Sequence, residues 1–254
     1  MAYAEVNGTR LHYEDEGTGR PLLFLHGFGT SGRVWDAQRP EFVRDHRVVT
    51  VDWRGCGRSD HPLPGNDMAT VVADLVGLIE VLGLDRPVVV GSSIGAAFAI
   101  ELALRHPELV GGAVSVDGSA HWVSLGFPVQ PLLDGLAANR AGTVAGWVPE
   151  WYGPDAPAEL ARSTVRQILD SGVYIDAHFL EAVTYDPRPR LPELRVPVHY
   201  VHGELSHIPL EISRECAELS PGAELRVVAG AAHMPHQERV GEFNGVLREL
   251  LLVG

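Results

Sequence analysis

The chain has 254 residues, of which 45% are hydrophobic and 21% charged, and its formal net charge at pH 7 is -13. This length and composition predict one sizeable folded core and argue against a disordered chain. The negative charge disfavours tight, nonspecific binding to nucleic acid or to an anionic membrane, because either partner would repel an acidic surface. We therefore expect a small-molecule partner.

The sequence also carries no sign of export. It opens without a charged and then apolar leader, and no apolar run approaches the roughly 20 residues that span a bilayer. Its two cysteines, Cys56 and Cys216, have neither metal-ligand nor redox spacing. We expect a reduced, cytoplasmic setting.

The first predicted element is an antiparallel hairpin. Residues 2–6 and 10–15 alternate apolar and polar side chains in the manner of strands. Between them, Asn7 and Gly8 accept the positive φ angles of a tight turn.

Short apolar runs alternate with helical segments through most of the remaining chain. The runs lie at residues 21–25, 47–52, 87–90, 111–116, 197–201 and 223–228. Residues 68–82 are typical of the helical segments, since apolar side chains recur there every three or four positions behind Asn66 and Asp67. Strands that are apolar on both faces and alternate with helices predict an α/β fold with a mostly parallel sheet covered on both sides.

The alternation of strands and helices breaks once. Residues 119–186 contain no convincing strand, so we expect a helical insertion there, with residues 1–118 and 187–254 forming the core domain. Aromatic side chains gather in this insertion, among them Trp122, Trp147, Trp151 and Tyr152. They either form a small core of the insertion itself or face a ligand.

A glycine-rich stretch offers one functional hypothesis. Residues 27–32 match G-x-G-x-x-G after a strand, and Asp52 ends the next strand about 20 residues later, as in a dinucleotide-binding fingerprint. This pattern alone would indicate a nicotinamide-dependent oxidoreductase. Against it, His26 stands where the strand should run into the first glycine, and the following helix is short and meets Pro40.

A second glycine-rich turn offers a stronger hypothesis. Residues 91–95 read GSSIG, which fits G-x-S-x-G with Ser93 at its centre, between a predicted strand and a predicted helix. Such a turn is tight, so its flanking positions have to be small, and Ser92 is then a flanking residue. Ser93 is the candidate nucleophile.

A serine nucleophile needs a base within hydrogen-bond reach. His233 follows the last predicted strand and precedes the terminal helix, which puts it at the same edge of the sheet as Ser93. His236 is its competitor, and a metal pair of the two histidines is conceivable, but no third ligand with metal spacing accompanies them.

With these features the chain resembles the α/β-hydrolase superfamily over nearly its whole length. The resemblance rests on HGFG at 26–29, DWRGCGRS at 52–59, GSSIG at 91–95 and GAAHMPH at 230–236. It implies an eight-stranded, mostly parallel sheet, Ser93 as nucleophile, His233 as base, and an oxyanion hole formed by the backbone N–H groups of Phe28 and Ile94. It also implies that residues 119–186 form a cap whose aromatic side chains shape an apolar substrate pocket.

The triad acid departs from the family pattern. Family members usually place it after the penultimate strand, where this sequence has Ser206. Some relatives place it at the end of the strand that follows the nucleophile helix, and Asp117 stands there. We predict Asp117 as the acid, with Glu204 or no carboxylate at all as alternatives.

An acid in this position resembles that of lactonases acting on the macrolide zearalenone and that of cofactor-free dioxygenases that cleave heteroaromatic rings. The dioxygenases usually carry a histidine directly after the serine, where this chain has Ile94. The sequence therefore predicts a serine hydrolase for a carboxylic ester or lactone with a bulky hydrophobic portion, without cofactor or metal. A cofactor-independent dioxygenase is the alternative, and a non-catalytic receptor on the same fold is a weaker one.

Overall fold

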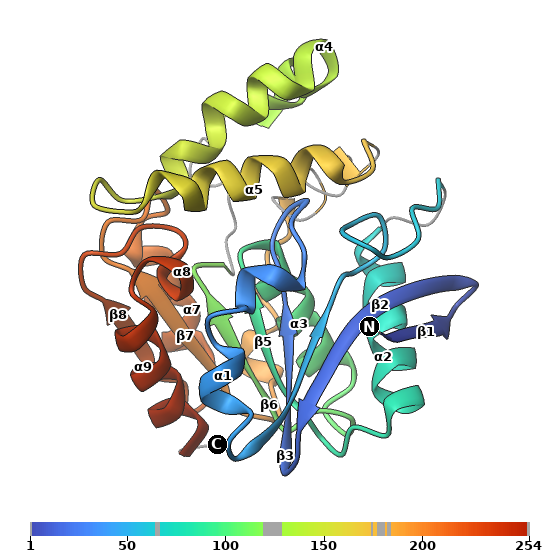
Figure 1. The fold of residues 1–254 in the computed structure, drawn as a ribbon. Helices are drawn as coiled ribbons and strands as arrows, with labels where there is room; N and C mark the ends of the chain where they lie inside the picture. Colours follow the sequence, from blue (N-terminus) through green and yellow to red (C-terminus); the bar gives the residue numbers. More distant parts are fainter. Residues whose placement is uncertain are drawn as a thin grey trace.

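The computed structural model describes residues 2–63, 67–118, 129–173, 175–176, 181 and 184–252. These residues form an eight-stranded sheet in the order β1-β2-β4-β3-β5-β6-β7-β8 (Figure 1). The strands are β1 Ala2–Val6, β2 Thr9–Gly17, β3 Arg20–Leu25, β4 His46–Val51, β5 Val88–Ser92, β6 Gly112–Val116, β7 Val198–Gly203 and β8 Leu225–Val228.

The sheet is antiparallel at one edge and parallel elsewhere. β1 pairs with β2 and β2 with β4 in antiparallel fashion, whereas all pairs from β4 to β8 are parallel. At the hairpin, Val6 pairs with Thr9, and the two turn residues Asn7 and Gly8 have φ angles of 45° and 70°. These left-handed conformations are the ones that asparagine and glycine tolerate best, so the predicted hairpin is confirmed.

Helices flank the sheet (Figure 1). The α-helices are α1 Arg39–Phe42, α2 Met68–Leu82, α3 Ile94–Arg105, α4 Val129–Trp147, α5 Ala158–Asp170, α7 Leu210–Leu219, α8 Pro235–Glu238 and α9 Val240–Leu252. The described residues also form three short 3₁₀ helices, η1 Gly32–Trp35, η3 Val148–Trp151 and η4 Leu191–Glu193.

Helix α2 shows how the sequence sets an element's ends. The Asp67 side chain accepts the backbone N–H of Thr70 at 2.7 Å, which satisfies one of the donors that a helix N-terminus leaves unpaired. At the other end Gly83 adopts a left-handed conformation, with a φ of 57°, and ends the helix. The apolar positions Val71, Leu75 and Leu78 are buried, so the predicted helix and its inward face are confirmed.

The centre of the sheet forms the core of the protein. Residues 22–25 of β3 and residues 89–90 of β5 are fully buried, because helices cover both faces of these strands. Replacing one such leucine by alanine typically costs about 2–5 kcal/mol of stability. The predicted α/β fold with a mostly parallel, eight-stranded sheet is confirmed.

α4, η3 and α5 lie over one end of the sheet (Figure 1), and we call residues 129–170, which comprise these elements and the turn between η3 and α5, the helical layer. Ile168 of α5 packs over the loop that follows β3, since a Cβ atom at Gly29 would lie 3.1 Å from its side chain. Among the described residues between 129 and 184 the sequence forms helices and turns but no strand. The division into a core and an insertion at 119–186 stays a prediction.

None of the helices that the structure describes combines the length and the apolar character needed to cross a bilayer.

Candidate active site

Ser93 sits on a sharp turn between β5 and α3. Its φ and ψ angles are 54° and -120°, a strained conformation for a residue with a side chain, at a typical cost of about 1–3 kcal/mol. The turn closes tightly: a Cβ atom at Gly91 would lie 2.2 Å from the carbonyl oxygen of Gly95, and one at Gly95 would lie 2.5 Å from that of His26. The small residues of GSSIG are therefore a steric requirement. Ser93 is partly exposed, whereas its neighbours Ser92 and Ile94 are buried.

Asp117 lies next to Ser93, at the end of the adjacent strand. Ser92 pairs with Val116 in the parallel ladder, and the Ser93 N–H donates to the Val116 carbonyl oxygen at 2.9 Å. Asp117 also has a positive φ, 46°, and its N–H donates to the Val201 carbonyl oxygen on β7. The register of two strands thus brings the serine and the carboxylate together.

The Asp117 carboxylate is fully buried and has three hydrogen-bond partners. His233 Nδ1 lies 3.2 Å from Oδ1, Ser206 Oγ donates to Oδ1 at 2.7 Å, and the Gly203 N–H donates to Oδ2 at 2.8 Å. Burial alone would raise the pKa of Asp117, but its bond to His233, the charges of His233 and His202, and the N–H of Gly203 together lower it. The group is therefore ionised at neutral pH.

His233 lies on the loop between β8 and α8. Its own N–H donates to the carbonyl oxygen of Trp151 in the helical layer at 3.0 Å, and the Trp151 ring meets the imidazole edge-on at 5.8 Å between centroids. The His207 ring is also close, with 4.9 Å between the centroids of the two imidazoles. A Cβ atom at Gly203 would lie 1.9 Å from the Ala232 carbonyl oxygen, so the loop passes directly over the end of β7.

The structure separates the candidates for the acid. Asp117 is the carboxylate bonded to His233, whereas Glu204 Oε2 accepts the N–H of Gly230 at 2.8 Å. Ser206, at the family's usual acid position, donates its hydroxyl to Asp117. Sequence reasoning missed this last contact, because nothing in the spacing of two residues 89 positions apart indicates it.

The loop after β3 approaches Ser93 from the other side. A Cβ atom at Gly27 would lie 3.1 Å from Ser93 Cβ and 3.7 Å from its Oγ, so this loop passes close against the serine. The ring of Phe28, the next residue, contacts that of Trp147 in the helical layer at a tilt of 52°, with 5.9 Å between centroids. Phe28 follows Gly27 in the chain, and Ile94 follows Ser93 as the first residue of α3. Both backbone segments therefore lie next to the contact between Gly27 and Ser93.

His26 holds this loop in place. Its Nδ1 donates to the Gly27 carbonyl oxygen at 2.8 Å, its Nε2 accepts the Trp53 N–H at 3.2 Å, and its ring stacks on the Trp53 indole. Burial lowers the pKa of His26 to about 4, against the opposing charge of Asp52 and the bond to Gly27. His26 is a neutral structural residue.

The dinucleotide-binding hypothesis fails on Asp52. Its carboxylate accepts the N–H groups of Gly32 at 2.7 Å and Arg58 at 2.9 Å, and His12 Nδ1 lies 3.2 Å from it. A Cβ atom at Gly57 would come within 2.3 Å of the same group. The carboxylate is thus turned inward to fasten two loops instead of facing a ribose, and the strand order differs from that of a dinucleotide-binding sheet.

The predicted aromatic pocket residues lie in different surroundings. Trp147 and Trp151 pack edge to face at 4.9 Å between the Phe28 loop and His233. The Tyr152 hydroxyl bonds to Thr164 at 2.7 Å and Gln237 at 2.6 Å. Burial raises the pKa of Tyr152, so this phenol stays protonated. Trp122 lies outside the described residues.

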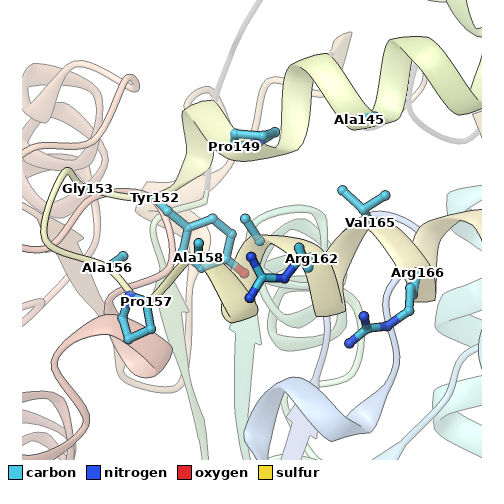
Figure 2. A pocket seen from close by; sticks show the side chains of 11 residues that line it. Ala145, Pro149, Tyr152, Gly153, Ala156, Pro157, Ala158, Arg162, Val165 and Arg166 are labelled. Atoms are coloured by element: carbon cyan, nitrogen blue, oxygen red, sulfur yellow. The ribbon is translucent and has the colours of Figure 1, made fainter.

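A cavity of about 560 Å³ opens within the helical layer (Figure 2). Its walls are mainly apolar: Ala145 and Pro149 lie on one side, and Val165 points toward them from α5. Tyr152 also lines it, but Ser93, Asp117 and His233 do not. The cavity is therefore separate from the Ser93 site.

His236 lies apart from the site. Its ring is fully buried and stacks on Trp35 at 4.3 Å, with neither nitrogen hydrogen-bonded in the described structure. Burial lowers the pKa of His236 to about 3, so the ring is neutral. Within the described residues no three histidine, cysteine, aspartate or glutamate side chains form a group able to hold a metal ion.

Comparison with known proteins assigns the family. Residues 20–169 match the alpha/beta hydrolase fold family. The AB hydrolase superfamily protein YisY of Bacillus subtilis (strain 168) is 27% identical over 94% of both chains. A 2-hydroxy-6-oxononadienedioate/2-hydroxy-6-oxononatrienedioate hydrolase of Paraburkholderia phymatum is 27% identical over 95% of this chain and 91% of its own length. The solved structure of Est816, an N-acyl homoserine lactone degrading enzyme, is 27% identical with a TM-score of 0.90, covering 98% of this chain and 99% of that one. The chain belongs to the alpha/beta hydrolase family.

Proposed function

We propose that this protein is a serine hydrolase that cleaves a carboxylic ester or lactone with a bulky hydrophobic portion. The observation that carries the proposal is the chain of contacts from Ser93 to His233. Ser93 stands on a strained turn, and its N–H bonds to Val116, the last residue of β6. Asp117 directly follows this strand and bonds to His233 Nδ1. A nucleophile, an acid and a base thus meet at one edge of the sheet.

The roles follow from the hydrogen bonds. Asp117 occupies Nδ1 of His233, so proton exchange with Ser93 uses Nε2. His233 takes the Ser93 hydroxyl proton as Oγ attacks the carbonyl carbon, and the N–H groups of Phe28 and Ile94 stabilise the resulting oxyanion. The imidazolium then protonates the leaving alkoxide, and water, activated by the same base, hydrolyses the acyl-enzyme.

Asp117 is suited to its role because it keeps its charge. A buried carboxylate with a lowered pKa stabilises the imidazolium that forms during attack. The bonds from Gly203 and Ser206 fix the carboxylate so that Nδ1 of His233, and not Nε2, carries the permanent proton.

The helical layer supports a hydrophobic substrate. Trp147 contacts Phe28 and Trp151 contacts His233, so two indole rings lie beside the residues that we propose to act with Ser93. We propose that residues 119–186 are the cap of this site and that Trp122 and Tyr152 contribute to it. Est816, a relative named as an N-acyl homoserine lactone degrading enzyme, is in keeping with a lactone as the substrate. Both cysteines are buried and no disulfide joins them, which is in keeping with a cytoplasmic protein.

The test combines labelling and turnover. A fluorophosphonate probe should label wild-type protein and Ser92→Ala, whose altered side chain is buried, but not Ser93→Ala, which should also lose at least about 10⁴-fold in ester hydrolysis. Aromatic esters and lactones should be turned over with a higher kcat/KM than acetate-sized or carboxylated esters.

Undiminished hydrolysis by Ser93→Ala would contradict the nucleophile assignment. Equal or better turnover of the carboxylated esters would contradict the pocket assignment. Oxygen consumption with hydroxylated quinolones, in protein that hydrolyses no ester or lactone, would instead support the cofactor-free dioxygenase alternative.

A further inference from the structure

One carboxylate outside the triad contacts the chain on both sides of His233. Glu238, the last residue of α8, accepts the N–H of Ala232 at 3.1 Å and that of Met234 at 3.2 Å, both on Oε1. One oxygen atom therefore accepts the backbone N–H groups of the two residues that flank His233. Because these hydrogen bonds hold the backbone on either side of His233, the carboxylate restrains where the imidazole points.

The other oxygen of this carboxylate reaches the helical layer. Oε2 accepts the N–H of Gly153 at 2.7 Å. Beside this contact, the Trp151 carbonyl oxygen accepts the N–H of His233, and the Tyr152 hydroxyl donates to Gln237 at 2.6 Å. Three consecutive residues, Trp151, Tyr152 and Gly153, are thus bonded to His233 and to the short helix α8 that follows it.

We propose that Glu238 is a positioning residue, which orients His233 for proton transfer and couples that orientation to the helical layer. This inference rests on the proposed role of His233 as the base. An ionised carboxylate is needed because three N–H donors converge on the group from two sides. Glutamine has one carbonyl oxygen and would turn its NH₂ group toward at least one of these donors.

Three titratable or charged groups lie around the Glu238 carboxylate. His233 lies on the loop that the carboxylate holds, and the neutral Tyr152 hydroxyl lies on the helical layer. Arg239, next in the chain, pairs with Asp155 at 3.8 Å. Burial raises the pKa of Glu238, although the backbone hydrogen bonds and the charge of His233 oppose this effect. Removing the negative charge would make the protonated imidazole less favourable.

Glu238→Gln tests the proposal. We expect kcat/KM for a neutral ester to fall about 10- to 100-fold, because a small displacement of a catalytic group has effects of this order. The loss should fall mainly on kcat, and the acid limb of the kcat/KM profile should move to lower pH. Amide hydrogen exchange should quicken at Ala232, Met234 and Gly153.

Glu204→Gln is the matched control. It removes another carboxylate that holds this loop, but its partner is the N–H of Gly230, three positions before His233. We expect its kcat and acid limb to match those of the wild type, with faster exchange confined to Gly230. If Glu238→Gln does not fold, Glu238→Asp keeps the charge but shortens the reach, so it should lose kcat without moving the acid limb.

Two results would overturn the inference: wild-type kcat and acid limb in a folded Glu238→Gln protein, or unchanged amide exchange at Ala232 and Met234. The exchange measurement needs no substrate. It therefore distinguishes failure of this inference from failure of the proposed function, which would show as a wild-type protein that neither reacts with fluorophosphonate nor hydrolyses any ester or lactone.

Discussion

Lowering the pH from 7 to 5 should destabilise this protein through two buried, neutral histidines. Burial holds the pKa of His26 near 4 and that of His236 near 3, whereas both groups have a pKa of about 6.5 in the unfolded chain. Below pH 6.5 the unfolded state therefore binds protons that the folded state does not. By linkage, stability falls as the pH falls through this window.

The magnitude follows from these pKa values. Between pH 7 and pH 5 each group lowers the free energy of unfolding by about 2 kcal/mol, or about 4 kcal/mol for the pair. This is a large part of a typical total stability of roughly 5–15 kcal/mol. Carboxylates with lowered pKa values, such as Asp117 and Asp52, also lower the stability as the pH falls, but only as it approaches and passes below their ordinary pKa of 3.8.

Urea unfolding at pH 7, 6 and 5 measures the effect. His236→Phe keeps an aromatic ring against Trp35 but removes the titrating group, so its loss between pH 7 and 5 should be about 2 kcal/mol smaller than that of the wild type. His61→Gln, a change of an exposed side chain, should leave the wild-type loss unchanged. A wild-type loss below about 1 kcal/mol, or an equal loss in His236→Phe, would refute the reasoning.

Two further predictions concern the acid. Asp117→Asn should lower kcat by about three to four orders of magnitude with the fold intact, since the amide favours the wrong imidazole tautomer. Adding Ser206→Asp to this variant should restore part of the rate, because Ser206 Oγ already lies 2.7 Å from Asp117 Oδ1. Steady-state kinetics check this, and near-wild-type kcat in Asp117→Asn would exclude the assignment. Ser206→Ala removes one hydrogen bond to the buried carboxylate and should lower kcat roughly 10-fold, so an unchanged kcat would mean that this bond does not orient Asp117.

Local sequence patterns were enough to predict most of the fold and about half of the candidate site. The hairpin at Asn7 and Gly8, the cap at Asp67 and the turn at Ser93 are each decided by a few neighbouring residues whose backbone preferences are strong. The position of His233 followed from strand order, because the carboxyl ends of parallel strands share one edge of a sheet.

The contacts that escaped prediction join distant segments. Ser206 donating to Asp117, and Glu238 bonding to Gly153, depend on how loops 85 or more positions apart come together. His236 resembled a second base or a metal ligand in the sequence, but packing buries it against Trp35. Side-chain type indicates what a residue can do, whereas tertiary packing decides which partner it meets.

The pairing of β5 with β6 also affects when the site comes into being during synthesis. Ser93 and Asp117 belong to one strand-helix-strand unit, which folds from a short, contiguous stretch of chain. His233 is 116 positions beyond Asp117, a length that a ribosome takes about 6–23 s to add at 5–20 residues per second. The proposed base is therefore made well after Ser93 and Asp117, so the proposed triad is complete only once the last strand and the loop after it have joined the sheet.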